Sequence, residues 1–323
     1  MNQYILRRIL QALPVLIGIT IITFTFTELA PGDAVSSMIL AQQDSMSTVD
    51  IETLRARYGL DQPAPVRYMA WMGGLLQGNM GVRIRSRVPV TEEIGRRLPA
   101  TLQLMFSALT IAILLGIPLG IYSALNQYSR LDYILTGFVF VGISIPGFFA
   151  ALAVIYVFGV KLDWFPTSGY STIGADFDFW GKQWDRLRYL SLPALVLGLE
   201  STASIMRYTR SSMLEVIRLE YIVTARAKGL SRFLLIARHA LRNAMLPVIT
   251  VIGLRLPTLF GGALIIETIF NWPGMGILYL DGVETRDYPL IMGMVLISAV
   301  LIVISNLITD LAYAIADPRI RYQ

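Results

Sequence analysis

The residues best suited to chemistry or to a specific contact are gathered in one basic segment. The stretch "TARAKGLSRFLLIARHALRNA" covers residues 224–244 and holds five Lys or Arg, no acid and one Gly. Gly229 suits the left-handed backbone position that closes a helix. Ser231 stands where a helix N-cap is favoured. The segment therefore predicts two short helices joined by a tight turn over residues 228–231.

Apolar residues at helical spacing flank this turn on both sides. They are Met213, Ile217 and Tyr221 before it, and Phe233, Ala237 and Leu241 after it. Ala225 and Ala227 keep the approach to the turn thin. A thin, basic helix end is well suited to enter a groove on another protein. A basic segment lying on anionic lipid is the alternative, but it explains the small residues and the tight turn less well.

Catalytic and metal chemistry find little support in the residue types. The chain has no Cys and one His, His239, which excludes a thiol nucleophile, a thiolate metal site and a His pair. A phosphate-binding G-x-x-x-x-G-K-[ST] loop, an H-E-x-x-H helix and a G-x-S-x-G turn are all absent. Uphill transport would therefore need an ion gradient or another subunit. The net charge of +5 comes from loops, which favours lipid headgroups or a partner protein over nucleic acid.

The elements that must position this segment are membrane-spanning helices. The chain has 323 residues, of which 55% are hydrophobic and only 15% charged, with a mean hydropathy of +0.60. A soluble domain would be about a quarter charged. Six apolar segments are long enough to cross a hydrocarbon layer of about 30 Å, and only helices can do so in open spans. The expected spans are 9–30, 101–125, 133–160, 190–210, 246–269 and 288–316.

The distribution of Lys and Arg orients these spans. Basic residues are most frequent in the loops on the side of the two termini, which predicts that both termini and the segment 211–245 are cytoplasmic. The N-terminal apolar run is too long for a typical signal peptide, so it is interpreted as a retained first helix. The first loop contains "IETLRARYGL", "PVRYMAWMGGLLQG" and "VTEEIGRRL", each with helical spacing. These segments predict a small helical cap on the extracytoplasmic side.

The predicted organisation is an all-α polytopic membrane protein in four parts. Residues 1–30 form the N-terminal tail and first transmembrane helix, and 31–98 form the extracytoplasmic helical loop. Residues 99–316 form a five-helix core that includes the cytoplasmic coupling loop 211–245. The cytoplasmic tail is 317–323.

Two charges are expected inside the bilayer. Glu200 lies about 15 Å into the fourth span and Arg255 about 14 Å into the fifth, counting 1.5 Å per residue. An isolated charge at this depth costs at least about 2.5–3.5 kcal/mol, so partners are expected. Glu200 and Arg255 are therefore candidates to pair with each other or to line a translocation path; separate contacts to backbone or water are the alternative.

Other residues of the spans have simpler interpretations. Glu28 and Glu267 are expected at the membrane interface. Pro118, Pro146 and Pro257 are expected to kink their helices. An outer aromatic belt would contain Trp164, Trp180, Trp184 and Trp272.

The segments "EYIVTARAKGL" and "HALRNAMLPVIT" resemble the EAA loop, the cytoplasmic signature of ABC importer permeases, in the form found in the dipeptide/oligopeptide/nickel permease family. The resemblance covers nearly the whole chain. It includes "RRILQALPVLIGIT", "DWFPTSGY", "IIETIFNWPGMG" and the tail "DPRIRY". The long loop between the first two spans points to the B-type subunit. The chain departs from the family at Asn79, where Asp is common, and at Glu200 and Arg255, where a small residue and Gln are usual.

The resemblance implies the type I ABC importer permease fold and a multi-pass location in the prokaryotic plasma (inner) membrane. It implies four kinds of partner: a homologous C-type permease subunit, two cytoplasmic ATPase subunits, an extracytoplasmic substrate-binding protein and membrane lipid. ATP and Mg would be bound by the ATPases and not by this chain, which is not expected to be an enzyme. The residues implied in coupling to the ATPase are Glu220, Thr224, Ala225, Arg226, Ala227, Lys228, Gly229 and Arg232.

The favoured function is therefore ATP-driven import of di- or oligopeptides, with this chain forming half of the translocation path. Import of nickel, glutathione or glycosides by the same kind of machine is the alternative within the family. An ion-coupled secondary transporter is the alternative from another class, but the internal repeats typical of such proteins are not evident. A membrane protein that docks a cytoplasmic partner without transport is a third possibility.

Overall fold

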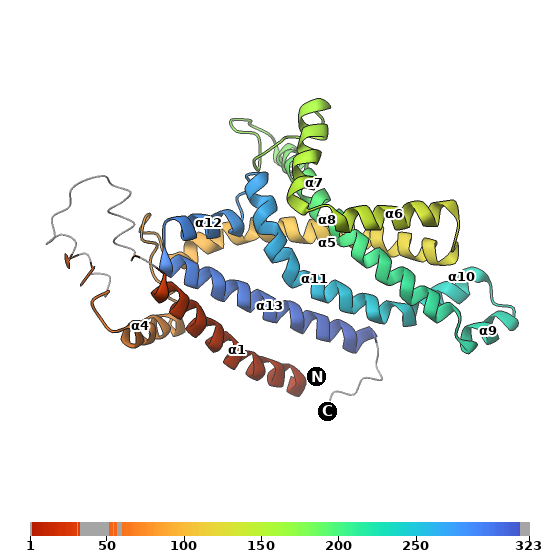
Figure 1. Cartoon of the computed structure of the whole chain (residues 1–323), viewed down its shortest axis with the longest axis horizontal. Coiled ribbons are helices and arrows are strands. Elements are labelled where there is room, and N and C mark those ends of the chain that lie inside the picture. The colour runs from red at the N-terminus through yellow and green to blue at the C-terminus, as the bar shows by residue number, and fades with distance from the viewer. Residues whose placement is uncertain (1, 31, 33–51, 54, 57–59, 317–323) are drawn as a thin grey trace. The chain divides into compact units, whose positions relative to one another are not determined.

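A computed structural model describes the chain except for residues 1, 31, 33–51, 54, 57–59 and 317–323. The described residues form helices and no strand, with one isolated antiparallel bridge between Val82 and Pro89. The helices are α1 (Asn2–Leu29), α4 (Ala64–Leu76), α5 (Val90–Leu125), α6 (Arg130–Ser144), α7 (Gly147–Val154), α8 (Phe179–Ile217), α9 (Glu220–Ala227), α10 (Arg232–Leu234), α11 (Leu241–Ile269), α12 (Met275–Glu284) and α13 (Tyr288–Ala316), with π-helical segments η1 (Ile155–Lys161) and η2 (Leu235–Ala240) (Figure 1).

Five of the six expected spans each lie inside a single helix, to within one residue at its end, and the third falls on a bent pair of helices. Among the described residues, five helical segments are long and apolar enough to cross a membrane, and the bent pair formed by α6 and α7–η1 makes a sixth if it is counted as one span. Two boundaries differ from the prediction. The segment "VTEEIGRRL" is not a separate loop helix, because α5 continues from Val90 through the second span to Leu125. The helix that contains the fifth span does not begin near residue 246, because α10, η2 and α11 run on from Arg232 without a break.

The third span is bent by 107° between Ser144 and Gly147. Pro146 has no backbone N–H to donate and disfavours a helical conformation in the residue before it. Accordingly α6 ends at Ser144, and Ile145 is extended, with φ −83° and ψ 122°. Pro146 then precedes the first residue of α7. The expected kink at this proline is therefore confirmed, and it is a change of direction large enough to break the span.

The described chain divides into two compact units: 1–99 with 274–303, and 100–273 with 304–323. In the second unit α8 packs against α11, α6 and α7 (Figure 1). In the apolar 18-residue stretch of α8 that could cross a membrane, 72% is buried, whereas in the corresponding stretch of α1 only 6% is buried. The fourth span, which is one of the two least apolar, is therefore shielded by other helices. Several of its serines and threonines are buried there, as at Ser201, Thr202 and Ser204.

Glycine allows α5 and α8 to approach closely, as small residues do between membrane helices. A Cβ atom added to Gly116 would lie 2.9 Å from side-chain atoms of Ile205, and one added to Gly120 would lie 2.6 Å from Thr209 Cβ. A Cβ atom added to Gly198 of α8 would likewise lie 2.9 Å from side-chain atoms of Ile111 in α5. The two helices are thus in contact over several turns.

The first unit contains α1, α4, the start of α5, α12 and the first part of α13. A short hairpin around residues 82–89 lies between α4 and α5. The helix expected in "PVRYMAWMGGLLQG" is α4. Half of the segment "IETLRARYGL", in which a helix was expected, lies outside the described residues.

Arg83 of the hairpin is surrounded by carboxylates of the same unit. Its guanidinium lies 3.5 Å from Glu93 and 3.4 Å from Asp287 and forms a further ion pair with Asp281. Burial raises the pKa of Asp287, although hydrogen bonds from the backbone N–H groups of Leu290 and Ile84 and the nearby Arg83 act in the opposite direction. These contacts hold the hairpin against the turn between α12 and α13.

Two residues expected at the membrane interface are instead buried in the second unit. Glu267 is fully buried and its carboxylate accepts a hydrogen bond of 2.6 Å from Thr101 Oγ1. Trp272 is also fully buried; its indole N–H donates to the carbonyl of Ala100 at 2.9 Å, and its ring meets Tyr170 edge-on. Both predictions were wrong because hydropathy gives the depth of a residue and not which neighbours cover it. Trp164, Trp180 and Trp184 are exposed, as an interfacial position requires.

Candidate coupling site

The predicted turn between two short helices is present. The helix α9 begins at Glu220 and ends at Ala227, and Gly229 follows with a left-handed φ of +80°. Its N–H donates to the carbonyl of Arg226 at 3.0 Å, which closes the helix end. The Ser231 hydroxyl then caps α10 by accepting a hydrogen bond from the N–H of Leu234. The turn at 228–231 is therefore set by local sequence, as Gly and an N-cap Ser predict.

A buried contact anchors α9 to the rest of its unit. Ile222 is fully buried in a cluster with Met213 at the end of α8, Leu235 and Ala240 of η2, and Ala124 near the end of α5. The helix α9 therefore packs against the ends of α5 and α8 and against η2. Tyr221 was expected to continue one helix with Met213 and Ile217, but α8 ends at Ile217 and Tyr221 belongs to α9.

The expected coupling residues do not share one environment. Arg226, Ala227, Lys228 and Gly229 are exposed, and Ala225 is half-buried. Glu220 and Thr224 are exposed on the first turns of α9, where the Thr224 hydroxyl donates to the Glu220 carbonyl at 2.9 Å. Arg232 is also exposed, but its guanidinium donates to the carbonyl of Leu125, the last residue of α5, at 3.3 Å. A cation at a helix C-terminus is favourably placed, so Arg232 links α10 to α5.

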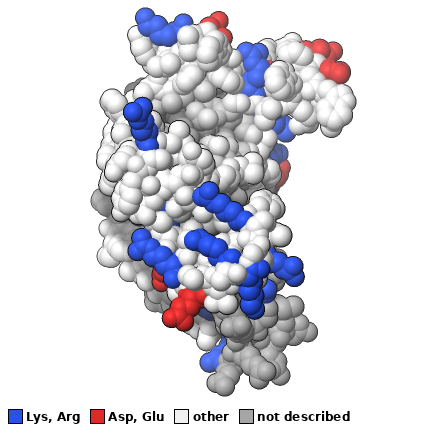
Figure 2. All heavy atoms as spheres, turned by 90° about the vertical axis from the view of Figure 1, so that its right-hand side faces the viewer, with Lys and Arg blue, Asp and Glu red and all other residues white. Residues whose placement is uncertain are grey.

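The outer surface of this region combines charge with apolar side chains. Figure 2 shows the side on which α9 and α10 lie, with Lys and Arg spread over its lower half and few acidic side chains between them. Phe233 is 78% exposed beside them, and Val223 and Leu234 are also exposed. Large exposed apolar residues rimmed by charge are typical of an interaction site. The surface is therefore suited to a protein partner.

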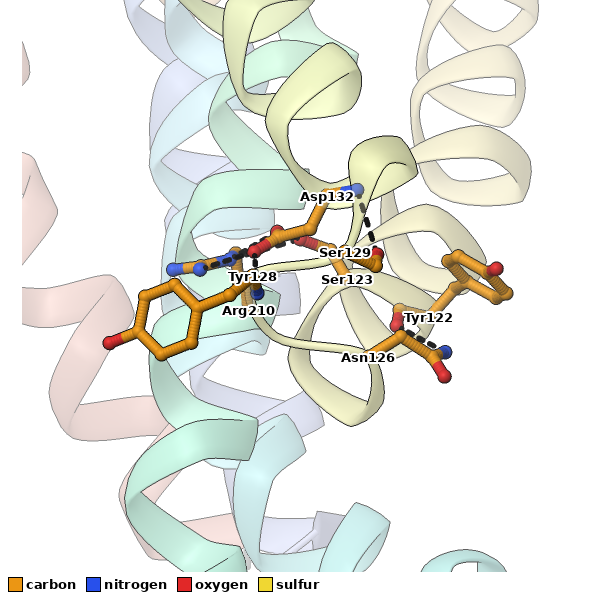
Figure 3. Close-up of polar contacts among 7 residues, drawn as sticks. All are labelled: Tyr122, Ser123, Asn126, Tyr128, Ser129, Asp132 and Arg210. Carbon is orange, nitrogen blue, oxygen red and sulfur yellow. Dashed lines mark hydrogen bonds and ion pairs between the residues drawn. The ribbon is translucent and has the colours of Figure 1, made fainter.

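Behind this surface an ion pair between α6 and α8, together with a serine hydroxyl of α5, connects three helices (Figure 3). Asp132, in the first turn of α6, is almost fully buried and accepts two hydrogen bonds of 2.9 Å from the guanidinium of Arg210 in α8. The hydroxyl of Ser123 in α5 donates to the same carboxylate and accepts a hydrogen bond of 2.9 Å from Arg210. The N–H of Tyr128 donates to Asp132 at 3.0 Å. We call Ser123, Asp132 and Arg210 the clasp.

The clasp was missed by sequence reasoning, although one local signal was present. "SRLD" at 129–132 has the S-x-x-D pattern that starts a helix, and the Ser129 hydroxyl does cap α6 by accepting from the N–H of Asp132. That pattern identifies the position of Asp132 but not its partner. Arg210 is 78 residues further along the chain, and only the packing of α6 on α8 brings the two together.

Among the described residues no ion pair joins Glu200 to Arg255, the two charges expected inside the bilayer. Arg255 donates instead to the buried hydroxyl of Ser204, one turn further along α8 than Glu200. A carboxylate oxygen of Glu200 faces the start of α7, since a Cβ atom added to Gly147 would lie 3.4 Å from it. Within the described ranges no group of three His, Asp or Glu could hold a metal ion.

The long apolar helices and the bent span are features of a polytopic membrane protein. Residues 116–322 match the family described as "Binding-protein-dependent transport system inner membrane component", and residues 1–105 match the N-terminal family of the same systems. The chain belongs to this family and is a multi-pass ABC importer permease of the bacterial inner membrane.

Relatives that match over their full length support this assignment. The chain is 46% identical to the oligopeptide transport system permease protein AppB of Bacillus subtilis, with all of both chains covered. It is 41% identical to the dipeptide transport system permease protein DppB of Escherichia coli, again over all of both chains. Among solved structures, the MetNI methionine ABC transporter in inward facing conformations matches 69% of this chain and 96% of its own, with a TM-score of 0.53 and 15% identity. That likeness concerns the fold alone.

Proposed function

We propose that the chain is the B-type permease subunit of an ATP-driven importer for di- or oligopeptides. Family membership supports the permease role, and the names of the full-length relatives support peptides as the substrate class. In this proposal a C-type permease subunit completes the translocation path, and an extracytoplasmic binding protein delivers the peptide. Two cytoplasmic ATPase subunits bind ATP and Mg and power the cycle.

The observation that carries the mechanism is the construction of α9 and its turn. The helix end is thin, basic and exposed at Arg226, Lys228 and Gly229, while Ile222 fixes it to the ends of α5, α8 and η2. A rigid element of this kind can dock into a groove and pass a displacement to the helices on which it sits. We infer that the segment 211–245 faces the cytoplasm, as do both termini, and that the loop 31–98 is extracytoplasmic.

The route of the displacement follows from two contacts. Arg232 ties α10 to the last carbonyl of α5, and the clasp ties α5 to α6 and α8 through Ser123, Asp132 and Arg210. When the ATPases close on ATP, the two permease subunits would be drawn together at their coupling helices. The path would then change from inward-facing to outward-facing, as alternating access requires.

The path itself would include Glu200 and Arg255. Glu200 belongs to α8 and Arg255 to α11, and these two helices pack against each other in the second unit. A carboxylate and a guanidinium close together would favour a zwitterionic peptide over a neutral sugar. Removing each charge in turn, with Glu200→Gln and Arg255→Gln, is expected to lower peptide uptake more than ATP hydrolysis.

The proposal is tested with the complete importer reconstituted in vesicles with its binding protein. In Gly229→Val a β-branched residue replaces a glycine at φ +80°, where L residues are disfavoured by roughly 1–2 kcal/mol. The variant is expected to insert normally but to lose binding-protein-stimulated ATP hydrolysis and peptide uptake. Gly229→Asn is the matched control, because Asn tolerates the left-handed conformation. A Gly229→Val importer with unchanged uptake and stimulation would contradict the coupling role.

The substrate class is tested separately. The binding protein is purified with its cargo, and the cargo is identified by mass spectrometry. Peptides are the expected result. Nickel, glutathione or a glycoside would overturn the peptide assignment while leaving the permease role in place.

A further inference from the structure

A cavity of about 290 Å³ lies in the first unit, at the ends of two membrane spans. Thr27 and Glu28 belong to the last turn of the span that ends at Leu29. Tyr288 and Pro289 belong to the first turn of the span that begins at Tyr288. A face of α4 forms another wall. The ends of spans lie at the level of the lipid headgroups, so this cavity opens where a headgroup is available.

Two hydrogen-bond donors of the α4 wall lack a partner. Arg67 and Trp71 are four residues apart and therefore share a face of the helix. Arg67 Nε and Trp71 Nε1 are both buried, and neither has a hydrogen-bond acceptor among the described residues. A buried donor left unpaired costs about 1–3 kcal/mol. The two side chains therefore favour an acceptor at this place that the described part of the chain does not supply.

The charges of the lining balance. Arg67 forms an ion pair with Glu28 of α1, and these are the two charged residues among those that line the cavity. Most of the remaining lining is aromatic or apolar, including Phe24 and Met292. A ligand with a net charge would leave one of the two lining charges without a counterpart. A ligand that carries one acceptor group and one cation matches the lining better.

The surface of α1 beside the cavity suits acyl chains. Residues of α1 with large apolar side chains are exposed along its length, including Ile22, Phe26 and Leu29 near the cavity end. Such a surface is ordinary for a membrane helix, because lipid tails cover it. It gives the cavity an apolar continuation that a free headgroup or an amino acid would not use.

We propose that this cavity binds the headgroup of a zwitterionic phospholipid. The phosphate accepts hydrogen bonds from Arg67 Nε–H and Trp71 Nε1–H. The ammonium group faces the Glu28 carboxylate, and the acyl chains follow α1. The site is separate from the coupling residues and does not depend on the transported substrate.

The experiment uses the full-length chain purified in detergent within its importer, with bound lipid counted by native mass spectrometry. After delipidation the protein is titrated with dihexanoylphosphatidylethanolamine. Three further probes separate the sources of affinity: dihexanoylphosphatidylglycerol has the same chains but an anionic headgroup, glycerophosphoethanolamine has the headgroup without chains, and inorganic phosphate has neither. The ethanolamine lipid is expected to bind at least fivefold more tightly than each of the others.

Two variants test the assigned contacts. Trp71→Phe keeps the aromatic wall but removes one donor, and it is expected to weaken the ethanolamine lipid roughly fivefold, the effect of one hydrogen bond. Trp180→Phe, at an exposed tryptophan of α8, is the matched control and should change nothing. Glu28→Gln removes the partner of the ammonium group and should abolish the preference for ethanolamine over glycerol headgroups.

Three results would overturn the proposal. They are equal affinity for the ethanolamine and glycerol lipids in the unaltered protein, equal binding by the chain-free headgroup, and unchanged lipid affinity in Trp71→Phe. If Trp71→Phe does not fold, the change of headgroup preference in Glu28→Gln decides the matter, because a purely structural role of Glu28 would not alter selectivity.

Discussion

Replacing Asp132 with Asn would show how much the clasp contributes to the fold. The Asp132 carboxylate accepts hydrogen bonds from four donors: two guanidinium N–H groups of Arg210, the hydroxyl of Ser123 and the N–H of Tyr128. The substitution keeps the shape of the side chain. It removes the negative charge and turns one acceptor into a donor that faces other donors.

The size of the effect follows from burial. Removing one partner of a buried ion pair costs about 3–5 kcal/mol. The side chain of Arg210 is 27% exposed, so water compensates part of the loss, and we expect about 2–3 kcal/mol. For a chain of 323 residues this corresponds to a decrease in the unfolding temperature of about 3–5 °C.

The assay is thermal unfolding of the purified full-length chain in detergent, followed by tryptophan fluorescence. Ser123→Ala removes one hydrogen bond of the clasp and should cost about 1 kcal/mol. Asp178→Asn is the matched control, since Asp178 caps the start of α8 and Asn caps helices equally well. The double variant Asp132→Asn with Ser123→Ala should lose less than the sum of the two single variants, because both act on the same carboxylate.

A different outcome would refute this reasoning. If the Asp132→Asn chain unfolded within about 1 °C of the unaltered protein, the ion pair would make no net contribution to stability. Many exposed ion pairs behave in this way. Strict additivity with Ser123→Ala would mean that Ser123 and Asp132 do not interact in the clasp.

Three further results are expected from the same unfolding assay. Gly120→Val adds a side chain whose Cβ atom would lie 2.6 Å from Thr209 Cβ, and overpacking should lower stability by about 1–3 kcal/mol; an unchanged unfolding temperature would mean that α5 and α8 are not in contact there. Thr101→Val removes a hydrogen bond to buried Glu267 and should cost about 1–3 kcal/mol, and Thr110→Val at an exposed position of the same helix is the control. Because burial raises the pKa of Asp287, the stability of the unaltered protein relative to Asp287→Asn should be greatest at low pH and fall as pH rises through that raised pKa; a difference that grows with pH would contradict it.

Local features of the site were predictable from the sequence. Gly229 adopts its left-handed conformation and Ser231 caps the next helix because each acts on its own backbone neighbours. The bend at Pro146 is predictable for the same reason, since a proline changes the conformation of the residue before it. The magnitude of the bend, 107°, was not predictable, because it depends on the helices that pack against α6 and α7.

Burial of polar side chains was harder to predict. Hydropathy placed Glu267 and Trp272 near the ends of spans, which is consistent with an interfacial position. In the structure both are covered by other segments of the second unit. An averaged hydropathy value has no information about the side of a helix to which a residue points. Arg232 is a similar case, because its exposed position in a basic loop did not indicate that it bonds to the end of α5.

The sequence by itself determined the class of protein, the number of spans and the presence of a basic helix–turn–helix between the fourth and fifth. These properties depend on runs of about 20 apolar residues and on the conformational preferences of single residues, which act over short distances along the chain. Only the tertiary structure decided that Asp132 meets Arg210 and that Ile222 anchors α9. It also decided that Arg67 and Trp71 line a cavity. Each of these contacts joins residues of separate helices or loops, and the packing of those helices sets which side chains come within reach.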